Sequence, residues 1–342
     1  MSSILSINKR GKLQRADNSL VFVEYGESGE IIKKIKIPIL KISQIDIYSK
    51  VDFDSELLYL LNSYNIGINF FHNYTNTHYG EFNMWNQKGS EKLMMKQFDC
   101  YLNKRSYYIE KFYKGIIQNL IFVLSKYQKR GDIGKDITII SKDIRKKSLL
   151  INSNDNYLLF EASIWKTFYS SIDKIISKPE FKFIKRTKRP PENRMNALIS
   201  LMNTKLYFTV NSIIKSTKLD NRIGFIHELT DTSRFSLALD IAELFKPFFT
   251  FYFILNNINN KKITSNDFSN NVLLNEFGLS KINKLYFEFL NQTVYVKNLK
   301  RKVSFKHLIK IECYKLIKSF YNDKEYQPIN FKEVFDEDNF NI

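Results

Sequence analysis

The sequence predicts an α+β protein in which a small N-terminal β-sheet domain, residues 1–85, precedes a larger all-α domain, residues 90–342. Short segments with alternating or β-branched residues fill the first part, whereas long segments with apolar residues at helical spacing fill the second. The chain has 342 residues, 44% of them hydrophobic, which is enough for one large domain or two ordinary ones. We therefore expect strands and helices to be segregated along the chain.

Strand patterns separated by turn residues fill the N-terminal region. The clearest strands are SLVFVEYG (19–26), IIKKIKIPI (31–39) and QIDIYSK (44–50), with a further pair in IGINFFHNYTNTHYGEF (66–82). The turn residues ESGE predict a hairpin between the first two strands. The segment DFDSELLYLLNSYN predicts one short helix, which Asp52 or Asp54 can cap.

Long segments of the second region have the spacing of amphipathic helices, for example residues 96–127 and 304–321. Two stretches between the helical segments resemble linkers, residues 141–155 and 182–194. The second of these carries six basic side chains among thirteen residues and a Pro-Pro pair, which stops a helix and keeps the chain extended. Its basic side chains can follow a phosphate backbone, although a solvated surface loop also explains them.

The charge balance limits the classes of partner. The chain has 53 Lys and Arg residues against 35 Asp and Glu residues, a net charge of +18. Such a balance favours a polyanion, which can be DNA, RNA or an anionic membrane surface, while a lysine-rich composition from an AT-rich genome is the simpler alternative. The sequence contains no Gly-x-Gly-x-x-Gly motif, P-loop or Ser nucleophile elbow, so a nucleotide cofactor or a hydrolase triad has little support.

Cysteine use and hydropathy indicate a cytoplasmic protein without a membrane span. Cys100 and Cys313 form neither a disulfide framework nor a Cys-x-x-Cys metal motif, which favours a reducing compartment. The N-terminal MSSILSINKRGKLQ lacks the apolar core of a signal peptide. The most apolar run, FFTFYFIL, is far shorter than the roughly 20 residues that a membrane span needs.

One helical segment, SRFSLALDIAELF, places a carboxylate in an apolar stripe. The stripe consists of Leu237, Ile241 and Leu244. Asp240 falls inside it, Glu243 lies one turn further on, and Ser233 is the expected N-cap. His227 stands just upstream. An unpaired carboxylate in such a position is costly, so the arrangement requires a partner for Asp240.

A second segment, NDNYLLFEASIWKTFYSSIDKII, repeats this arrangement with Glu161. Its apolar stripe consists of Leu158, Trp165, Phe168 and Ile172. Taken singly, each acid can be satisfied by an arginine or a backbone amide. Two such acids and a nearby histidine suggest a shared divalent metal at Glu161, His227 and Asp240. Carboxylate oxygens suit Mg²⁺ or Mn²⁺, and the imidazole favours Mn²⁺.

Three segments together resemble the family of CRISPR-associated adaptation integrases and endonucleases ("Cas one"), over nearly the whole chain. KRTKRPPENRMNALIS is similar to the Arg-Pro-Pro loop and Asn-Ala-Leu helix of that family. GFIHE followed by SLALDIAELFKP resembles its Gly-Phe-x-His segment and its Leu-Asp-x-x-Glu-x-Phe-Arg-Pro helix. IECYKLIKSFYNDKEYQPI resembles its closing helix and Tyr-x-Pro end.

The resemblance implies an active site and a set of DNA contacts. The family's metal ligands match Glu161, His227 and Asp240 of this chain. Glu243 matches the second acid of the later helix and is a candidate for a second metal or a supporting role. The resemblance and the excess of basic residues also make four side chains candidates for DNA binding. They are Arg186, Lys188, Arg189 and Lys246.

The resemblance also implies a reaction and partners. A DNA 3′-hydroxyl attacks a phosphodiester of the CRISPR repeat, so that spacer DNA is inserted into the array; water as the nucleophile gives endonuclease activity instead. The expected cofactor is Mg²⁺ or Mn²⁺, and the expected substrate is double-stranded DNA. The expected partners are a second copy of the chain, joined through the β domains, and a small ferredoxin-like second adaptation protein.

Two other functions remain open from the sequence. One is a metal-dependent nuclease that acts on branched DNA repair intermediates without integration. The other is a non-catalytic nucleic-acid-binding scaffold, in which Glu161 and Asp240 only pair with buried basic side chains. Metal-dependent nicking separates an enzyme from a scaffold, and half-site integration separates an integrase from a plain nuclease.

Overall fold

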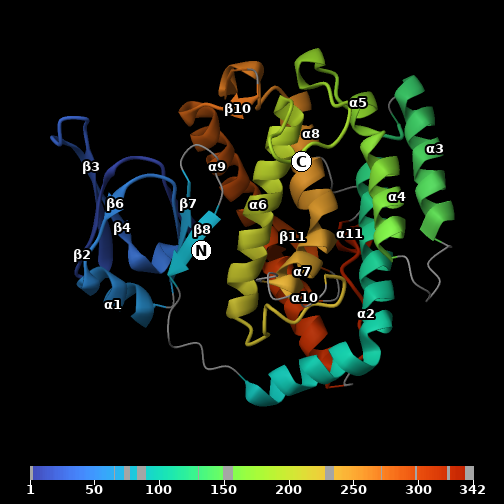
Figure 1. Cartoon of the computed structure of the whole chain (residues 1–342), viewed down its shortest axis with the longest axis horizontal. Coiled ribbons are helices and arrows are strands. Elements are labelled where there is room, and N and C mark those ends of the chain that lie inside the picture. Colours follow the sequence, from blue (N-terminus) through green and yellow to red (C-terminus); the bar gives the residue numbers. More distant parts are fainter. Residues whose placement is uncertain are drawn as a thin grey trace. The chain divides into compact units, whose positions relative to one another are not determined.

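The structure is a computed structural model, and it describes residues 3–64, 66–72, 78–82, 90–129, 131–148, 157–227, 235–270, 272–296, 299–321 and 324–335. The chain divides into two compact units. The first consists of Met1–Lys88 with Asn283–Phe287, and the second of Gly89–Ile282 with Glu288–Ile342. The chain begins with a strand-rich region and continues as a mostly helical one (Figure 1), so the predicted α+β class is confirmed.

Strands of the first unit form two four-stranded sheets among the described residues, with the orders β1-β5-β7-β8 and β4-β3-β2-β6. Their bounds are β1 Ser3–Ile7, β2 Gly11–Ala16, β3 Ser19–Tyr25, β4 Ile31–Pro38, β5 Ile42–Ile47, β6 Val51–Asp52, β7 Gly67–Phe71 and β8 His78–Phe82. The strands β3 and β4 pair in antiparallel fashion around the predicted ESGE turn. The strands β7 and β8 are also antiparallel, as the sequence predicted.

One apolar core joins both sheets to helix α1 (Ser55–Ser63). Leu57, Leu60 and Leu61 of this helix are buried in that core. The side chain of Asp54 accepts a hydrogen bond from the Leu57 amide over 3.0 Å, so Asp54 is the N-cap of the helix. A short 3₁₀ helix, η1 (Ile39–Lys41), connects β4 to β5.

The helical region carries the candidate site. Its helices are α2 Glu91–Ser125, α3 Gly131–Ser148, α4 Tyr157–Tyr169, α5 Ile172–Ile175, α6 Arg194–Lys215, α7 Ser236–Lys246, α8 Phe253–Asn259, α9 Glu276–Asn291, α10 Phe305–Phe320 and α11 Phe331–Val334. Short 3₁₀ helices are η2 Pro179–Phe181 and η4 Ser265–Asp267, and η3 Pro247–Tyr252 is a π-helix. Two antiparallel ribbons, β9 Phe268–Ser269 with β10 Leu273–Leu274 and β11 Thr293–Val296 with β12 Arg301–Ser304, were not predicted.

The prediction of a linker at residues 141–155 is wrong for residues 141–148, and residues 149–155 lie outside the described residues. Residues 141–148 continue helix α3, because Ile140 and Ile144 bury one face of it and the basic residues occupy the exposed side. The predicted loop at residues 182–194 is irregular up to Asn193, whose side chain caps helix α6. The apolar run FFTFYFIL lies within η3 and α8 and is buried. No helix in the described ranges is long and apolar enough to cross a membrane.

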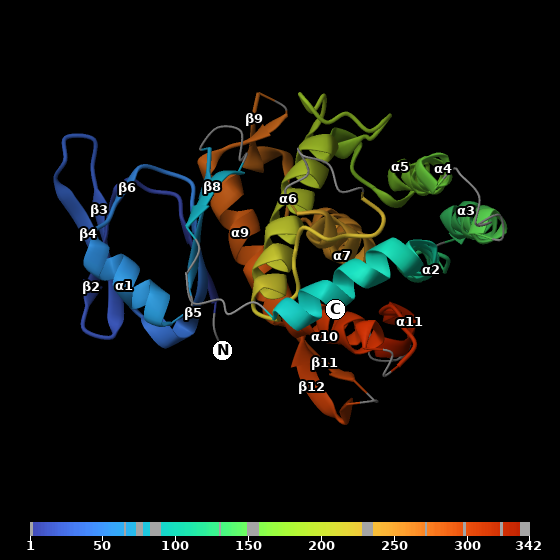
Figure 2. The same ribbon diagram turned by 60° about the horizontal axis from the view of Figure 1, so that its bottom comes forward.

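Helix α7 packs against both α2 and α6 (Figure 2). Its apolar face, formed by Leu237, Ile241 and Leu244, is completely buried, as the helical spacing predicted. Gly115 of α2 permits the close approach, because a Cβ atom at this position would lie 2.7 Å from Cδ2 of Leu244. The chain therefore brings residues of α7 to the middle of α2, close to the start of α4.

Candidate active site

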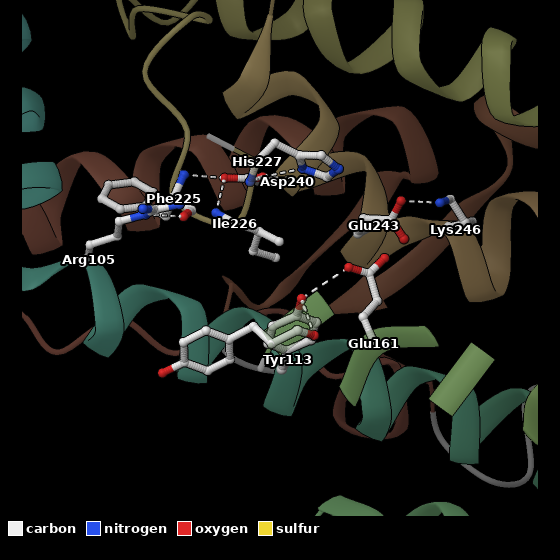
Figure 3. A network of polar contacts seen from close by, with 10 residues as sticks. Arg105, Tyr113, Glu161, Phe225, Ile226, His227, Asp240, Glu243 and Lys246 are labelled. Atoms are coloured by element: carbon white, nitrogen blue, oxygen red, sulfur yellow. Dashed lines mark hydrogen bonds and ion pairs between the residues drawn. The ribbon is translucent and has the colours of Figure 1, made fainter. Parts of the chain in front are cut away.

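Asp240 is the most completely bonded acid of the site. Its carboxylate is fully buried and accepts hydrogen bonds from the backbone amides of Phe225, Ile226 and His227, the last two over 3.0 and 3.1 Å. Its Oδ1 atom also lies 2.7 Å from Nδ1 of His227 (Figure 3). These four contacts fill the acceptor positions that a carboxylate offers. The buried charge of Asp240 is therefore satisfied by the loop that carries the histidine.

The loop needs a glycine where it passes α7. A Cβ atom at Gly224 would lie 2.6 Å from the backbone carbon of Ser236, 2.8 Å from the backbone nitrogen of Leu237 and 2.8 Å from Oδ2 of Asp240. Such distances are too short for any side chain. Glycine at this position thus allows the following amides to reach the Asp240 carboxylate.

His227 is held through one ring nitrogen. Burial alone would lower the pKa of His227, but the hydrogen bond and charge of Asp240, helped by Glu243 and Glu161, raise it above its ordinary value. Because Nδ1 faces Asp240, Nε2 is the ring nitrogen that can bind a metal or a substrate. About a third of the side chain is exposed, which leaves it accessible.

Glu161 and Glu243 face each other from helices α4 and α7 (Figure 3). Burial, and next the charge of Glu243, raise the pKa of Glu161 above its ordinary value, although Tyr113 and Lys246 act in the opposite direction. The Tyr113 hydroxyl, from α2, donates to Oε2 of Glu161 over 3.0 Å. Two acids that repel each other in a partly buried position are a suitable environment for a cation.

Glu243 has one satisfied and one unsatisfied oxygen. Its Oε1 accepts a hydrogen bond from Lys246, whose ammonium group also lies 5.1 Å from the centre of the Trp165 ring. Its Oε2 is buried and has no hydrogen-bond partner among the described residues. An orphaned carboxylate oxygen beside Glu161 fits a divalent cation, which prefers oxygen ligands. Within the same described part of the chain, no three His, Cys, Asp or Glu side chains form a ready metal-binding group.

The structure thus arranges the four predicted site residues in two pairs, His227 with Asp240 and Glu161 with Glu243. Which of them bind a metal stays a prediction. The expected cap Ser233 lies outside the described residues, as does the side chain of Leu158.

The four predicted DNA-binding side chains differ in exposure. Lys188 and Arg189 are exposed, whereas the Arg186 guanidinium donates to Oδ1 of Asn196 over 3.1 Å and to the Ser200 hydroxyl over 2.9 Å. Lys246 is mostly buried by its contact with Glu243. Arg186 and Lys246 therefore have structural partners already, and the two exposed residues are better placed for phosphates.

Comparison with known proteins identifies the family. Residues 5–288 match the model of the family described as CRISPR associated protein Cas1. The chain is 35% identical over 333 residues to CRISPR-associated endonuclease Cas1 2 of Thermodesulfovibrio yellowstonii, which covers 96% of this chain and 98% of that protein. It is 36% identical over 322 residues to CRISPR-associated endonuclease Cas1 of Thermotoga maritima. This match covers 92% of this chain and 96% of that protein. The chain belongs to a family of CRISPR-associated endonucleases, and that family is Cas1.

Solved structures agree with this assignment. A CAS1 protein from Thermotoga maritima superposes with a TM-score of 0.79 at 32% identity, covering 94% of this chain and 98% of that one. The fold is shared with a casposase bound to its integration product, at a TM-score of 0.79 and 18% identity over 98% and 95% of the two chains. A chain of a Cas6-RT-Cas1–Cas2 complex also has this fold. It superposes with a TM-score of 0.76 at 16% identity, covering 98% of this chain and 36% of that chain.

Proposed function

We propose that the chain is a divalent-metal-dependent DNA endonuclease and integrase that inserts spacer DNA into a CRISPR array. The observation that carries this proposal is the pair of facing acids, Glu161 and Glu243, with an unsatisfied buried oxygen beside a histidine held by Asp240. The membership of the Cas1 family, and the fold shared with a casposase that binds an integration product, support the reaction.

Glu161, Glu243 and Nε2 of His227 are the groups that we assign to Mg²⁺ or Mn²⁺. We favour Glu243 over Asp240 as a ligand, because the Asp240 carboxylate already accepts four hydrogen bonds while Oε2 of Glu243 accepts none from the described residues. Asp240 then has the role of fixing the histidine ring, as carboxylates commonly do for metal-bound histidines. A bound divalent ion would stabilise negative charge at the attacked phosphate and increase the acidity of the attacking hydroxyl.

The proposed reaction is a transesterification. The 3′-hydroxyl oxygen of the spacer forms a new bond to a phosphorus atom of the repeat while the bond from that phosphorus to its 3′-oxygen breaks. The proton lost by the attacking hydroxyl balances the proton gained by the leaving oxygen. In the same position, water would give a cleaved strand. Tyr113 keeps Glu161 in place during the reaction through its hydrogen bond.

DNA contacts and assembly follow from charge and exposed surface. The net charge of +18 and the exposed Lys188 and Arg189 favour binding to phosphates with little dependence on sequence. We also propose a homodimer formed through the strand-rich unit and assembly with a small ferredoxin-like second adaptation protein. A Cas1–Cas2 complex contains a chain of the same fold, which supports the second of these proposals.

The decisive experiment measures half-site integration into a repeat duplex, together with nicking, in Mg²⁺, in Mn²⁺ and in EDTA. We expect both activities to require the metal and to be lost in Glu161→Gln and Glu243→Gln, but not in the matched control Glu288→Gln, whose side chain is exposed on α9. Nicking without integration would favour a plain nuclease. The absence of both, with DNA binding intact, would favour a scaffold.

A further inference from the structure

Three side chains of helix α2 at intervals of eight residues, Gln97, Arg105 and Tyr113, bond to the site or to the segment before His227. Tyr113 bonds to Glu161. The other two bond to the main chain of the segment that precedes His227. The helix is interrupted between Gln97 and Arg105 by non-helical backbone at Lys104, with φ −135° and ψ 20°. Helix α2 thus contacts both Glu161 and the segment that precedes His227.

Gln97 is completely buried and uses its amide to hold a turn of this loop. Its Nε2 donates to the carbonyl oxygens of Asp220 and Ile223 over 2.8 and 2.7 Å. Its Oε1 accepts from the Asp220 amide over 3.0 Å. The side chain therefore fixes the main chain at two points, four and seven residues before His227.

Arg105 holds the next part of the loop. Its Nε atom donates to the carbonyl oxygen of Phe225 over 2.9 Å, and its guanidinium lies 5.4 Å from the centre of the Tyr101 ring. The amide of Phe225 is bonded to Asp240. The residue two positions before His227 is therefore held by α2 through its carbonyl group and by α7 through its amide (Figure 3).

The chemistry of Gln97 argues against a packing role alone. Burying an amide side chain is unfavourable unless its polar atoms are bonded, and an apolar side chain such as leucine would fill a similar volume without that cost. The bonds of Gln97 go to the main chain of one turn, so they specify the path of the loop. The loop path in turn decides whether the amides of residues 225–227 reach Asp240.

We propose that Gln97 and Arg105 are positioning residues for His227, so that α2 sets the placement of the histidine loop relative to Glu161. This inference rests on the proposed function, because it assigns a purpose to the alignment of His227 with the paired acids. We assign neither residue a contact with the metal or the DNA. Both act through the main chain of residues 220–225.

The test follows the His227 ring directly. The chain has four histidines, so ¹⁵N-histidine labelling gives few ring signals, and His227→Gln identifies those of His227. In the metal-free protein we expect Gln97→Leu, Gln97→Glu and Arg105→Gln to shift or broaden the His227 ring signals and leave the others unchanged. Titration with Mn²⁺ should show an affinity reduced roughly tenfold, as for other residues that orient metal ligands.

The matched control is Gln128→Leu, which removes a half-buried glutamine bonded to Ser141 on α3. It should leave the His227 signals and the Mn²⁺ affinity as in the parent protein. If Gln97→Leu does not fold, Arg105→Gln decides, because it removes the hydrogen bond to the Phe225 carbonyl from a side chain that is only partly buried.

Unchanged His227 signals and Mn²⁺ affinity in Gln97→Glu and Arg105→Gln would overturn the proposal, even if thermal stability fell. A parent protein that neither binds Mn²⁺ nor cuts DNA would contradict the proposed function instead. In that case the ring signals of the metal-free protein would still decide the positioning role.

Discussion

Nδ1 of His227 lies 2.7 Å from Oδ1 of Asp240, and the backbone amide of His227 donates to the same oxygen over 3.1 Å. Asp240 therefore binds both the ring and the main chain of the histidine. This double contact makes Asp240 a structural anchor of the loop as well as a member of the site. Glu243, one turn later on the same helix, lacks such contacts at its Oε2 atom.

Removing Asp240 should affect folding more than removing Glu243. In Asp240→Ala, three backbone amides and a histidine ring lose their acceptor, and loss of one partner of a buried charged pair costs about 3–5 kcal/mol. In Glu243→Ala, the loss of the Lys246 contact is offset by relief of the repulsion with Glu161, so we expect a much smaller change. Urea unfolding of both variants in EDTA measures this difference. Equal destabilisation would show that Asp240 does not anchor the loop.

Replacing Gly224 should displace the loop from α7. Gly224→Ala places a methyl group against backbone atoms of Ser236 and Leu237, and we expect a loss of about 1–3 kcal/mol in stability together with a large loss of nicking. The control is Gly80→Ala in strand β8, where the nearest atom to the added methyl group is 3.9 Å away. The account is contradicted if Gly224→Ala remains as stable and as active as Gly80→Ala.

In the basic loop, residues 182–194, we expect Arg186 to have a structural role and Lys188 and Arg189 to bind DNA. Lys188→Ala with Arg189→Ala should weaken DNA binding and reduce the log–log salt dependence by about two units, without changing the melting temperature. Arg186→Ala should instead lower the melting temperature, because its guanidinium bonds to Asn196 and Ser200. Binding isotherms at several salt concentrations, with calorimetric melting of each variant, distinguish these effects. A salt dependence altered only by Arg186→Ala would reverse the assignment.

The edge strand β4 is the surface that we expect to join two copies of the chain. It carries exposed Ile31, Ile32 and Ile35, with 56%, 60% and 36% of these side chains accessible, at the outer edge of its sheet. The strand also carries Lys33, Lys34 and Lys36, so apolar contact on this edge depends on the isoleucines, and Ile32→Lys should convert a dimer to a monomer. Light scattering decides the matter, with Ile139→Lys on the exposed face of α3 as the control. A dimer that persists in Ile32→Lys would rule out this interface.

Helical periodicity identified two acids inside apolar stripes, and the family resemblance assigned them to a metal site, which stays a prediction. Asp240 and Glu161 each interrupt an apolar stripe, and their neighbours Leu237 and Phe168 are buried as expected. The partner of Asp240 could not be deduced, because its bonds go to the main chain of a loop whose path has no sequence period. The local signal for that path was Gly224, three residues before the histidine.

The sequence also could not predict contacts between distant parts of the chain. Gln97 lies 123 residues before Asp220, and a glutamine in a helix gives no sign of being buried. The inward orientation of Arg186 depends on Asn196 and Ser200 of the next helix, so charge alone could not separate it from its exposed neighbours. The fold class follows from the hydrophobic periodicity of the sequence. The roles of polar side chains depend instead on the groups to which they hydrogen-bond in the folded chain.

The most direct test of the central claim is a crystal structure of the protein with Mn²⁺, in which anomalous scattering locates the ion. We predict one ion within about 2.0–2.6 Å of oxygens of Glu161 and Glu243 and of Nε2 of His227. Asp240 should remain bonded to Nδ1 of that ring and to the three loop amides. An ion bound by Asp240 oxygens, with Glu243 turned away, would contradict this account.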